Sequence, residues 1–182
     1  YAVFCLKKKK AGPEVNRSLW GKGVTVAVLD SGVAAHPAFT EGQVMHVDLV
    51  NDGRPFEGHG TAIASLIVGS VDGAQGVSPG AGILDVRIAG ATGSDSFLLA
   101  RGIMTALDRG AQILNVSMGS YGDSPVVAQA ISEALRRGVV VVAAAGNDGA
   151  AVKNWPAAYP GVISVSGVDA SGQLAYYSNS GE

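Results

Sequence analysis

Three polar side chains stand where a folded chain can most easily position chemistry: Asp30, His59 and Asn147. Asp30 ends the apolar run 24–29, His59 lies between two glycines before an apolar stretch, and Asn147 follows the apolar run 139–145. A carboxylate can orient an imidazole that acts as a general base, and a side-chain amide can donate to developing negative charge. Together these residue types suit catalysis through an activated nucleophile.

Each of these residues also has a purely structural interpretation. Asp30 could cap the Asp-Ser-Gly turn, and Asn147 could adopt a left-handed turn conformation. A lone histidine before a helix is often a capping or surface residue. His36 and His46 are rivals to His59 as the base, but His36 precedes a proline in a turn and His46 lies in a short valine-rich strand. Neither rival has the glycine frame that leaves the His59 ring accessible.

Two glycine-rich segments superficially resemble nucleotide-binding loops. A dinucleotide-binding glycine motif must directly follow an apolar strand. The segment 58–64 follows a polar loop instead, and Gly21-Lys22-Gly23 precedes its strand. A Walker-type phosphate loop does not occur in the sequence. The sequence therefore argues against a nucleotide-binding α/β module, which we keep as the weakest alternative.

The elements that must position these residues alternate between strands and helices. Strands are predicted over residues 24–29, 83–88, 113–117, 139–145 and 162–166. Helices are predicted over 61–68, over 95–109 with Ser94 or Asp95 as N-cap, and from Ser124-Pro125 to Arg137. This alternation indicates an α/β fold with a parallel sheet and right-handed crossovers.

Composition narrows the class of protein further. The 182 residues are 47% hydrophobic and 15% charged, which is enough for a substantial core. The net charge of −2 argues against nucleic-acid or anionic-membrane partners. No apolar run approaches the roughly 20 residues that span a bilayer. The single Cys5 cannot form an intrachain disulfide, so it does not identify the compartment.

Seven segments in a fixed order carry a family resemblance that runs from about residue 20 to residue 181. They are Val-Leu-Asp-Ser-Gly at 28–32, Gly-His-Gly-Thr at 58–61, Gly-Val-Ser-Pro at 76–79, Asn-Val-Ser-Met-Gly at 115–119, Ala-Ala-Gly-Asn at 144–147, and the stretches 155–165 and 177–181. The chain resembles the subtilase family of subtilisin-like serine peptidases, in which the acid also precedes the histidine. The resemblance implies a three-layer α/β fold, a mostly parallel central sheet with helices on both faces. It also implies an N-terminal extension or arm at 1–19 and a C-terminally incomplete catalytic domain at 20–182.

The same resemblance assigns roles to residues. It implies that Asp30 orients His59, that His59 takes the proton of a serine, and that Asn147 donates to the oxyanion. Two strands would pair with a peptide substrate, and the wall and base of a specificity pocket would follow. These substrate-binding residues are Gly93, Ser94 and Asp95 on one strand, Ser117, Met118 and Gly119 on the other, and Ala144, Ala145, Gly146 and Asn154 at the pocket. The resemblance also places a cis peptide bond between Trp155 and Pro156.

The departures from the family concern the nucleophile and a metal. The Gly-Thr-Ser-x-Ala-x-Pro nucleophile segment should follow Gly181, and it is not within this sequence. Serines 31, 117 and 178 would have structural roles, so this chain alone is expected to be inactive. The loop 71–76 is poor in oxygen ligands, so a structural calcium ion has no clear ligand set there. No cofactor is expected for the chemistry.

The partners implied are a peptide or protein substrate, the missing C-terminal segment of the same protein, and a pro-segment inhibitor. The resemblance favours secretion. Without the missing segment, the sheet should expose an apolar patch larger than monomers usually show. The main alternative is a non-catalytic subtilase relative that serves as a binding or scaffold protein. The Asp30, His59 and Asn147 side chains argue against it, because loss of function usually relaxes all three positions.

Overall fold

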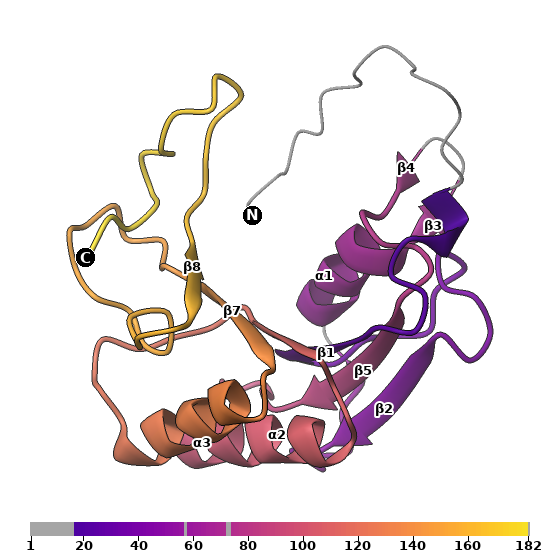
Figure 1. Ribbon diagram of the computed structural model, residues 1–182, viewed down its shortest axis with the longest axis horizontal. Coiled ribbons are helices and arrows are strands. Elements are labelled where there is room, and N and C mark those ends of the chain that lie inside the picture. The colour runs from indigo at the N-terminus through magenta and orange to yellow at the C-terminus, as the bar shows by residue number, and fades with distance from the viewer. Residues whose placement is uncertain (1–16, 57, 72–73, 182) are drawn as a thin grey trace.

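A six-stranded parallel sheet forms the centre of the molecule (Figure 1). The structure, a computed structural model, describes residues 17–56, 58–71 and 74–181. The strands follow the order β2-β5-β1-β6-β7-β8, and every neighbouring pair is parallel. The described elements are η1 (Arg17–Leu19), β1 (Thr25–Asp30), β2 (Val44–Asp48), α1 (Gly58–Val68), β3 (Ser70–Val71), β4 (Ala74–Gln75), β5 (Gly82–Arg87), α2 (Ser96–Asp108), β6 (Ile113–Val116), α3 (Pro125–Arg136), β7 (Val140–Ala144) and β8 (Ile163–Val165).

Helices cover both faces of the sheet, so the expected three-layer α/β fold is confirmed. Residues at alternate positions of β1 divide between two cores, because successive side chains of a strand point to opposite faces. Ala27 and Leu29 pack with α2 and α3, whereas Val26 and Val28 pack with α1. The two helices α2 and α3 lie together below the sheet in Figure 1, and α1 lies on the other side.

Local signals set most of the helix ends. The side chain of Asp95, one of the two predicted N-cap residues, accepts a hydrogen bond from the backbone of Leu98 at 2.8 Å and caps α2. Pro125 occupies the first turn of α3, where its missing N–H costs nothing. Helix α1 begins at Gly58, three residues before the predicted start at residue 61, so His59 lies inside its first turn.

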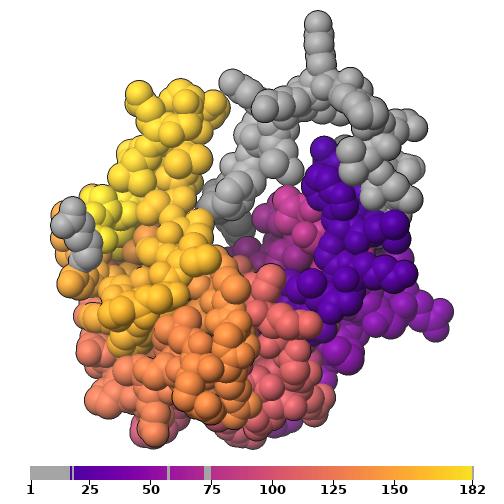
Figure 2. Space-filling view, in the orientation of Figure 1, coloured from indigo at the N-terminus to yellow at the C-terminus, as the bar shows by residue number. Residues whose placement is uncertain are grey.

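One half of the α1 face of the sheet has no helix on it. Val141 and Ala143 of β7 belong to the core beneath α2 and α3, so Val140 points to the α1 side, where it is 43% exposed. Ile163 of β8, which lies in register with Val142, is 52% exposed on the same side. Figure 2 shows the C-terminal segment (yellow) at the left of the molecule and the first described residues (indigo) at the right. Apolar side chains are thus exposed on this half of the sheet, while the size of the predicted apolar patch stays a prediction.

A cavity of about 410 Å³ adjoins this uncovered region beside α1. Ile63, Leu66 and Val77 line it from the α1 side, and Asn115 of β6 closes the opposite side. Leu66 and Val77 are about half exposed. The lining is mainly apolar, so a further apolar segment would fit against α1 and β6 there.

One smaller feature was not foreseen, and one expectation lies largely outside the described residues. The strands β3 and β4 form a short antiparallel pair in the loop after α1, which the sequence pattern did not indicate. The predicted N-terminal extension at 1–19 falls largely outside the described residues, which begin with the 3₁₀ turn η1. Within the part of the chain that the structure describes, no helix combines the length and apolar content needed to cross a membrane.

Candidate active site

The Asp30 carboxylate and the His59 imidazole meet at the carboxyl end of β1. Nδ1 of His59 lies 2.8 Å from Oδ1 and 2.9 Å from Oδ2 of Asp30, as the sequence analysis expected. Asp30 is 2% exposed, whereas 46% of the His59 side chain is exposed. With Nδ1 donating to the carboxylate, Nε2 is the ring nitrogen left to accept a proton. The pair therefore combines a buried orienting acid with an accessible base.

Ser31 fixes the carboxylate from the other side. Its backbone N–H donates to Oδ1 of Asp30 at 2.7 Å, and its hydroxyl donates to the same oxygen at 3.1 Å. The Ser31 hydroxyl also accepts from the backbone of Gly60 at 3.4 Å. These contacts link the turn after β1 to the first turn of α1. They also give Ser31 the structural role that was expected of it.

Close backbone contact explains one of the two glycines around His59. A Cβ built on Gly60 would lie 2.5 Å from the carbonyl oxygen of Gly32, so no other residue fits without moving the turn. This approach brings the start of α1 against the turn that follows Asp30. Gly60 therefore allows His59 to come close to Asp30, and it also leaves the His59 ring accessible.

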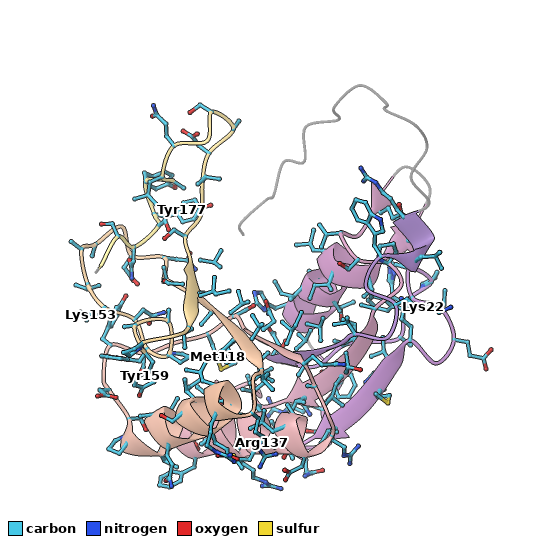
Figure 3. The ribbon with its side chains drawn as sticks, in the orientation of Figure 1. Lys22, Met118, Arg137, Lys153, Tyr159 and Tyr177 are labelled. Atoms are coloured by element: carbon cyan, nitrogen blue, oxygen red, sulfur yellow. The ribbon has the colours of Figure 1, made fainter. Side chains whose placement is uncertain are left out.

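The two predicted substrate strands lie across one cavity of about 390 Å³. Gly93, Ser94 and Asp95 line one side, and Met118 and Gly119 line the other. The cavity is mainly apolar, and Trp155 and Tyr159 close it at one end, with Met118 and Tyr159 labelled in Figure 3. A groove between two backbone segments suits an extended peptide with an apolar side chain in the cavity.

Tyr159 forms a rigid wall of this cavity. Its hydroxyl donates to Oδ1 of Asp123 at 2.6 Å and accepts from the backbone of Ser124 at 3.3 Å. Burial and the neighbouring Asp123 carboxylate raise the pKa of Tyr159 to about 12. The phenol therefore stays protonated and keeps its hydrogen bonds over the ordinary pH range.

Asn154 connects the predicted pocket wall to the second substrate strand. Its Nδ2 donates to the carbonyl of Ala144 at 2.8 Å. A Cβ on Gly119 would lie 2.3 Å from the same nitrogen, and a Cβ on Gly146 would lie 3.6 Å from the Asn154 Cβ. The structure thus brings together Asn154, 144–146 and 117–119, which lie far apart in sequence. The Trp155–Pro156 bond that follows is cis, as expected.

Asn147 is exposed on the loop that follows β7. Asn179 holds this loop, because its backbone N–H donates to Gly146 and its side-chain oxygen accepts from the backbones of Asp148 and Ala150 at 2.9 and 3.3 Å. The Asn147 side chain thus lies on a braced loop at the same carboxyl edge of the sheet as Asp30. Its role at the oxyanion stays a prediction.

The other two serines that could be mistaken for a nucleophile are engaged elsewhere. Ser178 is 3% exposed, and its hydroxyl accepts from the backbone of Gly167 at 2.9 Å. The Ser117 hydroxyl accepts from Nδ2 of Asn115 at 2.8 Å. Neither hydroxyl has a contact with His59 among the hydrogen bonds of the described residues.

Two buried charged residues beside the pair, Asp85 and Arg87 of β5, were not predicted from the sequence. They are 0% and 1% exposed, and Arg87 lies in register with Asp30. Burial, together with the Asp30 charge, raises the pKa of Asp85 in spite of its hydrogen bonds from His46 and Val33. The available signal was an acid and a base at alternate positions of an otherwise apolar strand.

The described residues offer no ready metal site. No group of three or more His, Cys, Asp or Glu side chains in this part of the chain could hold a metal ion. The loop 71–76, where a calcium ion was considered, is described only at Val71 and from Ala74 onward. Whether calcium binds in this loop stays a prediction.

Known proteins resemble this chain over nearly its whole length. The sequence is 38% identical over 170 residues to Subtilisin Savinase of Lederbergia lenta, covering 91% of this chain and 63% of that protein. It is 36% identical over 170 residues to the Thermostable alkaline protease of Halalkalibacterium halodurans, covering 91% of this chain and 47% of that protein. The chain thus spans about half to two-thirds of the length of these relatives.

Solved structures agree with the sequence comparison. The Prenylagaramide maturation protease PagA superposes with a TM-score of 0.80 at 30% identity, covering 91% of this chain and 61% of that one. The Patellamide maturation protease PatA gives a TM-score of 0.79 at 30% identity, covering 90% and 63%. The sequence model of the subtilase family matches residues 21–182. An acid at a strand end, a histidine at a helix start and this match lead to one conclusion: the chain belongs to the subtilase family.

Proposed function

We propose that the protein is a serine endopeptidase whose base is His59, oriented by Asp30, and whose nucleophilic serine lies outside these 182 residues. The observation that carries this proposal is the hydrogen bond from Nδ1 of His59 to a buried Asp30 carboxylate, with nearly half of the histidine side chain exposed. In this arrangement Asp30 holds one tautomer of the ring and stabilises the imidazolium that forms. His59 takes the serine proton and returns it to the leaving amine.

The groove supplies the substrate-binding part of the proposal. An extended peptide would lie between 93–95 and 117–119, pairing through its backbone with both segments. Ala144, Ala145, Gly146 and Asn154 would contact the side chain before the scissile bond. The Asn147 amide would donate to the oxyanion of the tetrahedral intermediate. No cofactor takes part in this chemistry.

The uncovered half of the α1 face supports a location for the nucleophile segment. Val140 and Ile163 are exposed there, and the apolar cavity beside α1 adjoins them. A segment that covered this surface would remove apolar area from water. We therefore propose that the remaining part of the protein packs on β6, β7 and β8 and carries the serine.

One further partner and a location belong to this proposal. A pro-segment would occupy the same groove as the substrate and inhibit the enzyme until removed. We propose secretion, which is supported by the name of one relative, the Minor extracellular protease Epr of Bacillus subtilis, 35% identical over 169 residues.

A serine-reactive fluorophosphonate probe tests the proposal directly. The protein extended by the residues that follow Glu182 in its gene should be labelled stoichiometrically, and His59→Ala should abolish the labelling. The 182-residue chain should not be labelled. Labelling of the 182-residue chain that depends on His59 would instead identify one of its own serines as the nucleophile. An extended protein that folds but takes up no probe would favour the non-catalytic relative.

A further inference from the structure

Strand β5 carries two buried charges on the same face of the sheet as the candidate catalytic acid. Ile83, at an alternate position of the strand, packs with α1, so Asp85 and Arg87 point to that side as well. In the parallel register Asp85 pairs with Val28 and Arg87 pairs with Asp30. A charge buried this deeply costs stability unless hydrogen bonds and counter-charges compensate it, so both residues need a specific reason.

Asp85 holds the far end of the turn that begins at Asp30. Its Oδ2 accepts from the backbone N–H of Val33 at 2.9 Å, three residues after the catalytic acid. The same oxygen lies 2.9 Å from Nδ1 of His46 on the adjacent strand β2. Oδ1 is buried with no hydrogen-bond partner among the described residues. Asp85 thus fixes the backbone that sets the direction of the Asp30 carboxylate.

His46 connects this carboxylate to the loop that leads into His59. The His46 ring stacks on Phe56, with ring centroids 5.8 Å apart and an interplanar angle of 28°. Phe56 lies three residues before His59 and covers the turn, because a Cβ on Gly32 would lie 2.7 Å from its ring. The Phe56 side chain therefore contacts both the turn after Asp30 and the His46 ring, which pairs with Asp85.

Arg87 holds the beginning of the same loop. Its Nη1 lies 3.0 Å from Oδ2 of Asp48 and 2.9 Å from Oδ1 of Asp52. The guanidinium carbon is also 5.4 Å from the centroid of the Phe56 ring, which suits a cation–π contact. The loop from β2 to α1 is therefore tied to β5 at its start by Arg87 and near its end by Phe56.

We propose that Asp85 and His46 are positioning residues of the Asp30–His59 pair: Asp85 fixes the turn after Asp30, and His46, through Phe56, fixes the loop before His59. The inference rests on the proposed function for the importance of that pair. Neither residue touches the substrate or the reacting atoms in this scheme. Because burial raises the pKa of Asp85, its ionised form is held at a cost in stability, which is typical of residues kept for function.

The test compares four variants of the full-length protein: Asp85→Ala, Asp85→Asn, His46→Phe and the control Asp108→Asn. Asp108 is an exposed carboxylate on α2 whose ion-pair partner is Arg137. Phenylalanine keeps the stacking on Phe56 and removes the Nδ1–H donor. The readouts are kcat and KM on a peptide substrate, amide hydrogen exchange at Val33, and the downfield proton resonance of the Nδ1–H that His59 donates to Asp30.

Asp85→Ala should lower kcat about tenfold and leave KM within about twofold, because small misplacements of reacting groups act on kcat. It should also speed exchange at Val33 and shift or broaden the His59 proton resonance. Asp85→Asn, which keeps an acceptor for Val33, should recover part of the loss. His46→Phe should lower kcat by a smaller factor, and its effect should not add to that of Asp85→Ala. Asp108→Asn should change none of these readouts.

The resonance and exchange measurements separate this inference from the proposed function. If the full-length protein shows no peptidase activity, the proposed function fails, but the His59 resonance still reports the pair. A folded Asp85→Ala protein with an unchanged His59 resonance and unchanged Val33 exchange would overturn the positioning role. If Asp85→Ala does not fold, unchanged resonances in both Asp85→Asn and His46→Phe would overturn it.

Discussion

Two Asp–His pairs lie side by side on one face of this sheet. In each pair Nδ1 of the histidine lies 2.8 to 2.9 Å from a carboxylate oxygen. In each pair the aspartate side chain is almost fully buried, at 3% and 1% exposure, while the histidine is exposed at 46% and 45%. By distance and burial alone, Asp30–His59 and Asp85–His46 could not be told apart.

The difference is their place relative to the end of the sheet. Asp30 is the last residue of β1, where the backbone turns away and leaves room beside the carboxylate. Asp85 lies inside β5, and Phe56 covers the face of its partner His46. In open parallel sheets ligands bind outside the carboxyl ends of the strands, which only the first pair reaches. The position in the fold, more than the pair itself, therefore decides which histidine is placed to act as a base.

Replacing each histidine by alanine should give the largest difference in kcat between the two pairs. In subtilisin, which supplies the figure, loss of the catalytic histidine lowers kcat about 10⁶-fold, and we expect a similar loss for His59→Ala in the full-length protein. His46→Ala should lower kcat no more than about tenfold, because it moves the pair without removing the base. Steady-state kinetics on a peptide substrate measures both values. Equal losses in the two variants would show that the positions are not distinguished as argued.

Replacing each aspartate by asparagine gives a smaller but equally asymmetric effect. Asp30→Asn should lower kcat about 10⁴-fold, because the amide cannot hold the required tautomer of His59 or stabilise its protonated form. Asp85→Asn should remain within about tenfold of the parent, since the amide oxygen can still accept from Val33. The ratio of the two kcat values is the measurement. A ratio near one would contradict a purely positioning role for Asp85.

Sequence patterns predicted the first pair because its determinants are local. A strand that ends on an acid, a histidine framed by glycines and an asparagine after an apolar strand are all visible in short windows. The family motifs then placed Asn154 at the base of a pocket walled by 144–146, and the structure brings Asn154 close to that wall and also to Gly119. Strands, helices and the Asp95 cap followed from periodicity and capping, within a few residues at each end.

The second pair could not be predicted, because it depends on the register between strands. His46, Asp85 and Val28 meet only because β2 and β1 flank β5 in a particular alignment. Nothing in the window around residue 46 indicates that alignment, so His46 was treated as an ordinary strand residue. Helix α1 begins earlier than predicted because Gly60, a weak helix former, packs closely against the turn at Gly32.

Removing Arg87 should destabilise the loop between β2 and α1. Arg87→Met deletes two ion pairs and the contact with Phe56, and we expect a loss of about 2 kcal/mol in the free energy of unfolding. The loss is smaller than for a fully buried pair because Asp48 and Asp52 remain 29% and 26% exposed and can be hydrated. Urea denaturation measures it. The matched control Arg137→Met breaks only exposed pairs with Glu133 and Asp108 and should cost almost nothing. An equal loss of unfolding free energy in both variants would show that Arg87 stabilises the fold no more than an exposed arginine does.

The smallest expected effect concerns the pH dependence of stability, where Asp85 and Asp48 should behave oppositely. Burial raises the pKa of Asp85 above its unfolded value, so the native state holds this proton more tightly and loses stability as pH rises through the raised pKa. Asp85→Asn removes that loss, so its Tm relative to the parent should be higher at pH 8 than at pH 4.

For Asp48 the shift has the opposite sign. Burial alone would raise the pKa of Asp48, but N–H donation from Asn51 and Val50 and the Arg87 guanidinium outweigh burial and hold that pKa below its usual value. Asp48 therefore stabilises the native state above its unfolded pKa and loses this effect as pH falls, so Asp48→Asn should lower Tm at pH 8 and less so at pH 4. Thermal unfolding at the two pH values checks both signs. If Asp85→Asn lowered Tm more at pH 8 than at pH 4, the hydrogen bonds from His46 and Val33 would outweigh the effect of burial. Ionised Asp85 would then stabilise the fold, and its burial would need no functional explanation.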